Sequence, residues 1–486
     1  MSETSLCDIN RAIDRVYKSQ RRFIVRMKIR KIKYNNHPVL GNLELDLVNH
    51  ITGQPYDTII LAGENGSGKT TILSSLNTFL CLGSFEYFDS IEYEVNGQHY
   101  MAKQTGDGND AKYGFYDRID LQSNVTERIH SNKNNGRDRI EADTFDIRHN
   151  GCVYSKARAN FSVRAIKGTT SMDVDNDRYD RDDQEDFSSL KQLIIDIQET
   201  DNEKLRDQMV HSPEQEFRYT DIEPSTKMYR FKQAFDHFFE TIKYDGVVTK
   251  DGEKIVQFNK HDSKVTIDKL STGEKQIVYR GAFLLRNVGR LDGATIMIDE
   301  PELSMHPKWQ NKILCYFKDL FKDDNGTQKA QMFFATHSEY VVGEALNDGA
   351  NTLVIVLSDN EGTIEKNEVR TPLVLPTITA SEINYAAFDV PSIDYHIALY
   401  GAIQTKYNKH SISCCDDFIH TQCQPVYIDA THGFITNYNG NTYHTLPTKI
   451  RNHIDHPDNP YTFTEDELKT SIQLMRDILL NVRITP

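Results

Sequence analysis

The sequence of 486 residues lacks any long apolar run and any targeting pattern at its start. No segment approaches the roughly eighteen consecutive apolar residues of a membrane-spanning helix, so we expect no contact with a membrane. The opening residues, MSETSLCDINRAIDR, contain no basic segment followed by an apolar one, which is the pattern of a secretory signal peptide. We therefore expect a cytoplasmic protein.

Cysteine is scarce and scattered along the chain. The seven cysteines include no C-x-x-C pair, which argues against a disulfide framework. One group has the residue types of a zinc site, but its adjacent cysteines do not have the usual ligand spacing, so we expect no metal there. This group comprises Cys414, Cys415, His420 and Cys423.

Positive charge is in deficit, since the formal net charge is −15. This argues against a protein that coats nucleic acid indiscriminately, because binding by counterion release needs clustered Lys and Arg. A local basic strip is present at residues 18–33, KSQRRFIVRMKIRKIK, on what reads as a strand. The strip is either the solvated face of an edge strand or a nucleic-acid contact, and the sequence leaves both open.

Apolar periodicity predicts an α/β fold. Apolar strands alternate with helical segments between residues 294 and 358, which is typical of a parallel sheet covered by helices on both faces. Residues 106–136 are rich in Gly, Asn and Asp, so we expect mostly loop there. The densely acidic residues 172–186, MDVDNDRYDRDDQED, should be exposed or mobile.

A glycine-rich loop stands between a predicted strand, YDTIILAG, and a predicted helix. It fits the G-x-x-x-x-G-K-T pattern, in which backbone N–H groups surround phosphate oxygens and the lysine contacts the β- and γ-phosphates. The threonine hydroxyl can bind Mg²⁺. We therefore expect ATP to bind at Gly63, Glu64, Asn65, Gly66, Ser67, Gly68, Lys69, Thr70 and Thr71.

The apolar run Ile296-Met297-Ile298 ends in Asp299 and Glu300. A buried strand of this kind would carry Asp299 to the Mg²⁺ beside Thr70 and place Glu300 to polarise the attacking water. His337 follows a later apolar strand, MFFAT, at a similar position. We expect these side chains to meet at one ATP and Mg²⁺ site, with Glu300 and His337 as catalytic residues.

The segment LSTGEKQ, residues 270–276, resembles the signature motif of ABC-type ATPases, whose serine and glycine lie at a helix N-terminus. In that family the signature of one subunit covers the nucleotide held by its partner. The resemblance therefore implies that Ser271 and Gly273 bind nucleotide across a homodimer or a higher homo-oligomer. It spans roughly residues 20–370 and makes His337 the switch histidine.

The segment DEPELSMHP, residues 299–307, is similar to that of SMC-like and overcoming-lysogenization (OLD-like) ABC ATPases rather than of transporters. Two features depart from the ABC pattern. The Q-loop glutamine has two candidates, Gln98 and Gln104, and the signature carries Thr272 and Glu274 where transporters usually have Gly and Gln.

The resemblance and the periodicity together divide the chain into two parts. Residues 1–371 are expected to form an ABC-type P-loop NTPase head with an inserted helical subdomain at about 172–245. The segment TPLVLP, residues 371–376, interrupts the pattern. Residues 377–486 are expected to form a smaller, mainly α-helical domain, with a hairpin that turns at Asn439 and Gly440.

The C-terminal segment LPTKIRNHIDHPDNP predicts a helix that ends before Pro457. Its Arg451, Asn452 and His456 resemble the R-x4-6-H motif of HEPN ribonucleases, and we expect Asn452 and His456 to share a helix face. An imidazole can exchange the 2′-OH proton near neutral pH, while a guanidinium can hold the scissile phosphate. This chemistry cleaves RNA without a metal.

The sequence therefore predicts an ATPase that controls a C-terminal ribonuclease acting on RNA, plausibly tRNA. It is similar to ABC–HEPN fusions and to PrrC- and RloC-type anticodon nucleases of bacterial antiphage defence, so a phage-derived activator is expected. The zinc hook of the RloC type is absent. The alternative is a defence or DNA-repair ATPase whose C-terminal domain only binds a separate effector protein. An OLD-type DNA nuclease ranks low, because the tail has no strand followed by Asp-x-Asp.

Overall fold

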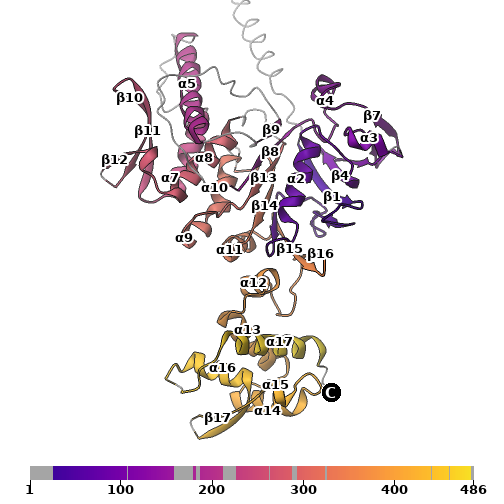
Figure 1. Ribbon diagram of the computed structural model, residues 1–486, viewed down its shortest axis with the longest axis vertical. Coiled ribbons are helices and arrows are strands. Elements are labelled where there is room, and N and C mark those ends of the chain that lie inside the picture. The colour runs from indigo at the N-terminus through magenta and orange to yellow at the C-terminus, as the bar shows by residue number, and fades with distance from the viewer. Residues whose placement is uncertain are drawn as a thin grey trace, which may run out of the picture.

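The computed structural model describes residues 26–106, 108–157, 179–181, 187–211, 226–261, 263–286, 293–322, 326–438, 440–458 and 460–482. Figure 1 shows a broad α/β part, coloured indigo to orange, above a smaller yellow unit. The helix α12 (Ala380–Phe388) lies between the two parts. Within these residues no helix is both long enough and apolar enough to cross a bilayer.

The central sheet of the α/β part has the strand order β16-β15-β3-β14-β13-β8-β9. All neighbouring pairs are parallel except β15 with β16. The middle strands β3, β14 and β13 are buried along their whole length, as expected for a parallel sheet covered on both faces. The strands are β3 (Thr58–Ala62), β8 (Cys152–Ser155), β9 (Tyr179–Arg181), β13 (Thr295–Asp299), β14 (Gln331–Thr336), β15 (Thr352–Asn360) and β16 (Thr363–Glu368).

Alternate residues of this sheet enter two separate cores. Ile60, Ile298 and Phe334 belong to the core that includes residues of α8 (Thr272–Leu285), α10 (Ile313–Leu320) and α11 (Glu339–Asn347). Ile59 and Phe333 belong to the core on the other face, which includes residues of α2 (Lys69–Leu80). The predicted α/β class, with helices on both faces of a parallel sheet, is therefore confirmed.

Two antiparallel sheets flank the central one. The first has the order β2-β1-β4-β5-β6-β7, and the second has the order β10-β11-β12. The second lies with α5 and α7 at the side of the molecule that carries α8 (Figure 1). The strands of the first sheet are β1 (Met27–Tyr34), β2 (Glu44–Asp46), β4 (Phe88–Val95), β5 (Gln98–Lys103), β6 (Tyr116–Asp120) and β7 (Thr126–Ile129), and those of the second are β10 (Ile242–Lys250), β11 (Glu253–Lys260) and β12 (Ser263–Thr266). The further helices of the α/β part are α3 (Gly108–Lys112), α4 (Arg137–Ala142), α5 (Phe187–His211), α7 (Lys227–Phe238), the 3₁₀ helix η2 (Ile267–Lys269) and α9 (Pro307–Gln310).

Two expectations about loops are wrong in part. The region 106–136 contains β6 and β7, which extend the first antiparallel sheet because Tyr116 and Ile129 bury their side chains in its core. Within the acidic segment, Tyr179–Arg181 form β9 at the edge of the central sheet. Residues 172–178 and 182–186 lie outside the described residues. Charge density and glycine content therefore conceal short strands that pair at the edges of larger sheets.

The C-terminal unit has its own hydrophobic core, whose residues lie between Leu375 and Leu479. The helix α12 contributes to both cores, since Ile383 and Ala387 face the head while Tyr385 faces the C-terminal unit. The domain boundary at 371–377 therefore stays a prediction. The remaining elements are α13 (Ile393–Lys406), α14 (Ile412–Gln422), α15 (Asp429–His432), β17 (Gly433–Tyr438), β18 (Asn441–Thr445), α16 (Leu446–Asp455) and α17 (Glu465–Asn481).

Candidate nucleotide-binding site

The predicted phosphate loop connects β3 to α2, and its glycines adopt conformations that other residues avoid. Gly63, Gly66 and Gly68 have φ values of +154°, +85° and +87°. A Cβ atom on Gly63 would lie 2.2 Å from the carbonyl oxygen of Leu357 on β15. The loop therefore needs glycine both for its backbone angles and for its close approach to the neighbouring strand.

Lys69 begins α2 and folds back over the phosphate loop. Its Nζ donates to the carbonyl oxygens of Gly63 and Glu64, at 2.9 and 2.7 Å, and to the Ser67 hydroxyl at 3.2 Å. Burial lowers the pKa of Lys69 to about 8, although the carboxylates of Asp299 and Glu300 oppose this shift. The ammonium is thus held inside the loop, where γ- and β-phosphate oxygens would compensate for its lost hydration.

Thr70 and Asp299 meet at the end of β13, as the sequence predicted. The Thr70 hydroxyl lies 3.0 and 3.2 Å from the two carboxylate oxygens of Asp299. Two neighbouring ligands of an octahedral Mg²⁺, each at about 2.1 Å, are separated by roughly 3.0 Å, so this oxygen pair fits the ion. The Tyr154 hydroxyl donates to the same carboxylate at 3.2 Å.

Tyr154 was missed by the sequence analysis. It lies on β8, whose parallel register sets Tyr154 opposite Met297, two residues before Asp299. No local motif marks this tyrosine, because only the pairing of β8 with β13 carries it to Asp299. Its hydrogen bond orients the carboxylate that would bind the cation.

Glu300 and His337 lie at the ends of the adjacent strands β13 and β14. Glu300 has a φ of +46°, and its N–H donates to the carbonyl of Ala335 at 2.9 Å. His337 Nε2 is 3.9 Å from the Glu300 carboxylate. Burial and the nearby Lys69 cation lower the pKa of His337, while Glu300, Asp299 and a hydrogen bond to the Gly63 backbone oppose this. A neutral imidazole therefore faces Glu300 at neutral pH.

Glu302 supports His337 and was not singled out as a site residue from sequence. Its Oε1 accepts hydrogen bonds from the Thr336 hydroxyl at 2.7 Å and from the His337 backbone N–H at 2.8 Å. Burial raises the pKa of this carboxyl group. The signal was available, because Glu302 is the third acid of DEPEL, three positions after Asp299.

The signature segment lies at the start of α8. The exposed Ser271 caps this helix in a reciprocal capping box with Glu274. Gly273 is packed so tightly that a Cβ atom there would be 2.8 Å from the carbonyl oxygen of Ser304. The same helix reaches the nucleotide site through Arg280, whose Nη1 donates to the carbonyl of Asp299 at 2.9 Å. Ser271 and Gly273 thus stand beside the DEPELSMHP segment of their own chain.

The Q-loop candidates occupy different positions in the first antiparallel sheet. Gln98 begins β5, is exposed, and accepts a hydrogen bond from the Tyr100 hydroxyl. Gln104 follows β5 and bonds with the Asn35 side chain and the Glu86 carbonyl, at 3.2 and 3.0 Å. Neither contact distinguishes a Q-loop glutamine.

The C-terminal motif is split between the core and the surface. Arg451 Nη2 forms an ion pair with Asp455 at 2.6 Å, and its Nη1 donates to the Asn452 side chain at 3.2 Å. Asn452 is buried, whereas His456 is exposed at the C-cap of α16, with φ −135° and ψ 81°. The helix ends at Asp455, so His456 does not continue the helical face of Asn452.

A second group of polar side chains lies elsewhere in the C-terminal unit. The rings of His420 and His444 stack with centroids 5.0 Å apart, and each imidazole lies near a carboxylate. His444 Nδ1 is 3.4 Å from Asp416, and His420 Nε2 is 3.8 Å from Asp429. Among the described residues, the zinc candidates Cys414, Cys415, His420 and Cys423 do not form a ligand cluster.

Comparisons with known proteins identify one family for this chain. A family model described as "AAA domain, putative AbiEii toxin, Type IV TA system" matches residues 90–343, just over half of the chain. No curated protein matches the chain. Solved structures that resemble it include the SMC head domain from Thermotoga maritima, at 14% identity and a TM-score of 0.36, covering 71% of this chain and 100% of that one.

Two further SMC head structures are similar to the same extent. One is bound to the C-winged helix domain of ScpA, with 12% identity, a TM-score of 0.39, and coverage of 70% of this chain and 98% of that one. The other, from Pyrococcus furiosus, has an extended coiled coil and is bound to the C-terminal domain of ScpA. It has 12% identity and a TM-score of 0.35, and the match covers 71% of this chain and 96% of that one.

Proposed function

The chain belongs to the family of AAA domains described as putative AbiEii toxins of type IV toxin–antitoxin systems, and we propose that it is an ATPase whose nucleotide state controls a ribonuclease in its C-terminal unit. The observation that carries the ATPase part is the meeting of Lys69 and Thr70 with Asp299 and Glu300 at one edge of the central sheet. The word toxin in the family description supports a protein whose activity, once released from control, harms its own cell.

The chain's own groups suit phosphoryl transfer to water. On nucleotide binding, Lys69 would exchange its bonds with the loop carbonyls for phosphate oxygens, and Thr70 and Asp299 would hold Mg²⁺. When bound, Mg²⁺ neutralises charge that develops on the β- and γ-phosphates. Glu300 accepts a hydrogen bond from the attacking water and orients it. His337 bonds the backbone of Gly63 at the start of the phosphate loop.

A second copy of the chain completes the site in this proposal. Ser271 is exposed at the N-terminus of α8, where the positive end of the helix dipole favours an anion. The contact of Arg280 with Asp299 connects that helix to the site within one chain. Nucleotide held by one subunit and capped by Ser271 and Gly273 of the other would thus report its state to both subunits.

Two features place the nucleotide site near the C-terminal unit and support coupling between them. The pKa of Lys469 on α17 is raised, chiefly by its bond to Asp389 and also by the carboxylate of Glu64 in the phosphate loop. His337 and two residues of α12, Asn384 and Phe388, line one cavity of about 330 Å³. A structural change at the γ-phosphate would therefore occur close to α12, the helix that lies between the two parts.

The ribonuclease part rests on Arg451 and His456. Arg451 is half-buried on α16 and His456 is exposed at its C-cap, and a guanidinium and an imidazole supply phosphate binding and proton transfer without a metal. The alternative, a C-terminal unit that only binds a separate effector, is favoured by a different observation. Ile393 and Ile397, four residues apart on α13, expose 46% and 37% of their surfaces.

The test compares wild type, His456→Ala and Lys69→Ala in growing cells, with RNA ends mapped after induction. We expect new RNA ends and slowed growth with wild type, at least about tenfold fewer ends with His456→Ala, and altered control with Lys69→Ala. His410→Ala is the matched control, because His410 is an exposed histidine of the same unit outside the motif. Equal cleavage by wild type and His456→Ala would contradict the ribonuclease assignment.

Dimerisation is tested separately by sedimentation of the purified protein. Glu300→Gln should form an ATP-dependent dimer, because bound nucleotide is no longer hydrolysed, and adding Ser271→Arg should abolish it. A protein that hydrolyses ATP and dimerises, yet leaves RNA intact and requires a second protein to slow growth, supports the effector-binding alternative. A monomer under all these conditions would contradict the shared nucleotide site.

A further inference from the structure

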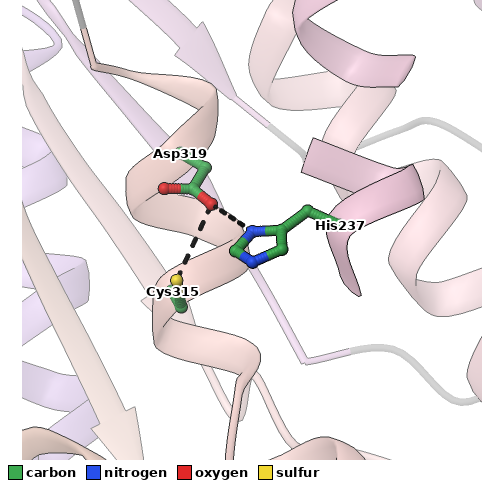
Figure 2. A group of neighbouring side chains, drawn as sticks. All are labelled: His237, Cys315 and Asp319. Carbon is green, nitrogen blue, oxygen red and sulfur yellow. Dashed lines mark hydrogen bonds and ion pairs between the residues drawn. The ribbon is translucent and has the colours of Figure 1, made fainter. Parts of the chain in front are cut away.

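Three side chains from two helices converge beside the seam between α7 and α10, away from the nucleotide site. Figure 2 shows His237, in the last turn of α7, pointing toward Cys315 and Asp319 of α10. His237 Nδ1 is 3.1 Å from Asp319 Oδ2, and Cys315 Sγ is 3.6 Å from the same oxygen. Cys315 and Asp319 are four residues apart, so they share one face of α10.

The spacing of these atoms suits a tetrahedral metal ion. With bonds of about 2.3 Å to sulfur and about 2.1 Å to nitrogen and oxygen, tetrahedral ligands are separated by roughly 3.4–3.6 Å. The two measured edges, 3.1 and 3.6 Å, are close to this, and all three ligand atoms lie within 4.8 Å of one another. The trio therefore needs only small side-chain rotations to bind an ion.

The backbone on both sides of the trio is held in place. Near His237, the neighbouring Asp236 carboxylate accepts the Tyr244 N–H at 3.0 Å. On α10, the Glu344 carboxylate accepts the Cys315 N–H at 2.9 Å. Asp319 uses its second oxygen, Oδ1, to bind Lys322 Nζ at 2.7 Å, which leaves Oδ2 directed toward the other two ligands. Metal-binding carboxylates typically make a second contact of the kind that Asp319 makes with Lys322.

We propose that His237, Cys315 and Asp319 bind a Zn²⁺ ion that joins α7 to α10. One sulfur, one nitrogen and one oxygen form a borderline-soft donor set, which favours Zn²⁺ or Co²⁺ over the Mg²⁺ expected at the nucleotide. Binding forms a Zn–S bond and releases the thiol proton to solvent, with no change in oxidation state. His237 is 73% exposed, so water can reach the fourth coordination position.

A second group of potential ligands, Asp416, Asp417 and His444, is less suited to this ion. The Asp416 carboxylate already accepts the backbone N–H groups of His444 and Thr445, at 2.7 and 3.1 Å, and the Thr445 hydroxyl at 2.6 Å. It also lacks a thiol. This group serves as the internal control for the experiment.

The ion would stabilise a seam that matters for the ATPase. The helix α7 precedes β10, β11, β12 and then α8, which carries Ser271 and Gly273, whereas α10 follows the DEPELSMHP segment. A bond across the seam would hold the signature helix in register with Asp299 and Glu300. The metal site itself does not depend on the ribonuclease proposal.

The test titrates Co²⁺ into metal-free, full-length protein and records the absorption spectrum. We expect visible d–d bands and a near-ultraviolet thiolate-to-cobalt band that saturate at one ion per chain and disappear on addition of Zn²⁺. Cys315→Ser should remove the thiolate band, and His237→Ala should weaken Co²⁺ binding at least about tenfold. Cys414→Ser and His444→Ala should leave both unchanged.

A thermal readout covers the case in which Cys315→Ser folds poorly. Zn²⁺ should raise the melting temperature of wild type by roughly 3 °C or more and leave that of His237→Ala unchanged, because a ligand stabilises only the state that binds it. His237 is mostly exposed, so its replacement leaves the core intact. Absence of a thiolate band in wild type, or its loss with Cys414→Ser instead, overturns the proposal.

Discussion

The polar motif residues are arranged differently in the head and in the C-terminal unit. In the head, Thr70 contacts Asp299 directly, and Lys69 bonds three oxygens of its own loop. In the C-terminal unit, Asn452 is buried while His456 lies on the surface beyond the end of α16. The head therefore brings its motif side chains together within one chain, whereas in the C-terminal unit Asn452 and His456 stay apart.

The difference follows from what each motif requires. The phosphate loop acts through backbone geometry, which glycines at positive φ determine locally, and its partners lie at the ends of adjacent parallel strands. The C-terminal motif depends on two side chains that flank a helix end. Where the helix stops decides whether they share a face, and that depends on Pro457 and on packing against neighbouring helices.

Gly63→Ala should break the head most severely. Its Cβ would lie 2.2 Å from the Leu357 carbonyl oxygen at a φ of +154°, so the loop must shift. We expect ATP hydrolysis to fall by about 1,000-fold, because the phosphate-binding N–H groups lose their alignment. Gly53→Ala is the control, since its φ is +71° but no described heavy atom lies within 4 Å of the added Cβ. Wild-type hydrolysis by Gly63→Ala would exclude this loop as the phosphate site.

Glu382→Ala should loosen the joint between the two regions. The buried carboxylate accepts the backbone N–H groups of Val374 and Leu375, at 2.8 and 3.0 Å, and the Tyr395 hydroxyl at 3.4 Å. Leaving these donors without an acceptor should lower the free energy of unfolding by about 3 kcal/mol. Chemical denaturation measures this loss, and limited proteolysis should reveal new cleavage near residues 371–392. Replacement of the exposed Glu365 by alanine should change neither the free energy of unfolding nor the cleavage pattern. If Glu382→Ala resists denaturant and protease as well as wild type does, other contacts hold the joint.

His396→Gln should alter how the C-terminal unit responds to acid. Burial lowers the pKa of His396 to about 3, whereas an unfolded histidine has a pKa of about 6.5. Below pH 6.5 the unfolded chain binds a proton that the folded chain does not, so stability falls progressively toward pH 3. Between pH 7 and pH 5 this proton uptake should lower the free energy of unfolding of wild type by about 2 kcal/mol. Urea denaturation should show this loss in wild type and not in His396→Gln. His410→Gln should keep the wild-type dependence; if His396→Gln keeps it too, another group is responsible.

Asn452→Leu separates a structural from a functional role at the C-terminal motif, with the smallest expected change in stability. The Asn452 amide nitrogen is buried and has no hydrogen-bond partner among the described residues. A leucine of similar size should therefore leave the free energy of unfolding within about 1 kcal/mol of wild type. Under the ribonuclease proposal, RNA cleavage should nevertheless fall at least about tenfold. Undiminished cleavage would assign Asn452 to the fold alone.

Local patterns in the sequence determined the parts of this protein that depend on neighbouring residues. The glycine-rich loop between a strand and a helix and the apolar strands of the central sheet both appear where they were predicted. Each results from backbone preference or periodic burial, which short segments encode.

Only the tertiary structure decided the contacts between distant segments. Tyr154 reaches Asp299 through the pairing of β8 with β13, although 145 positions separate the two residues. His237 meets Cys315 and Asp319 because α7 packs on α10, although the three share no sequence motif. Such contacts depend on which faces of helices and strands are buried together, and no short segment specifies that choice.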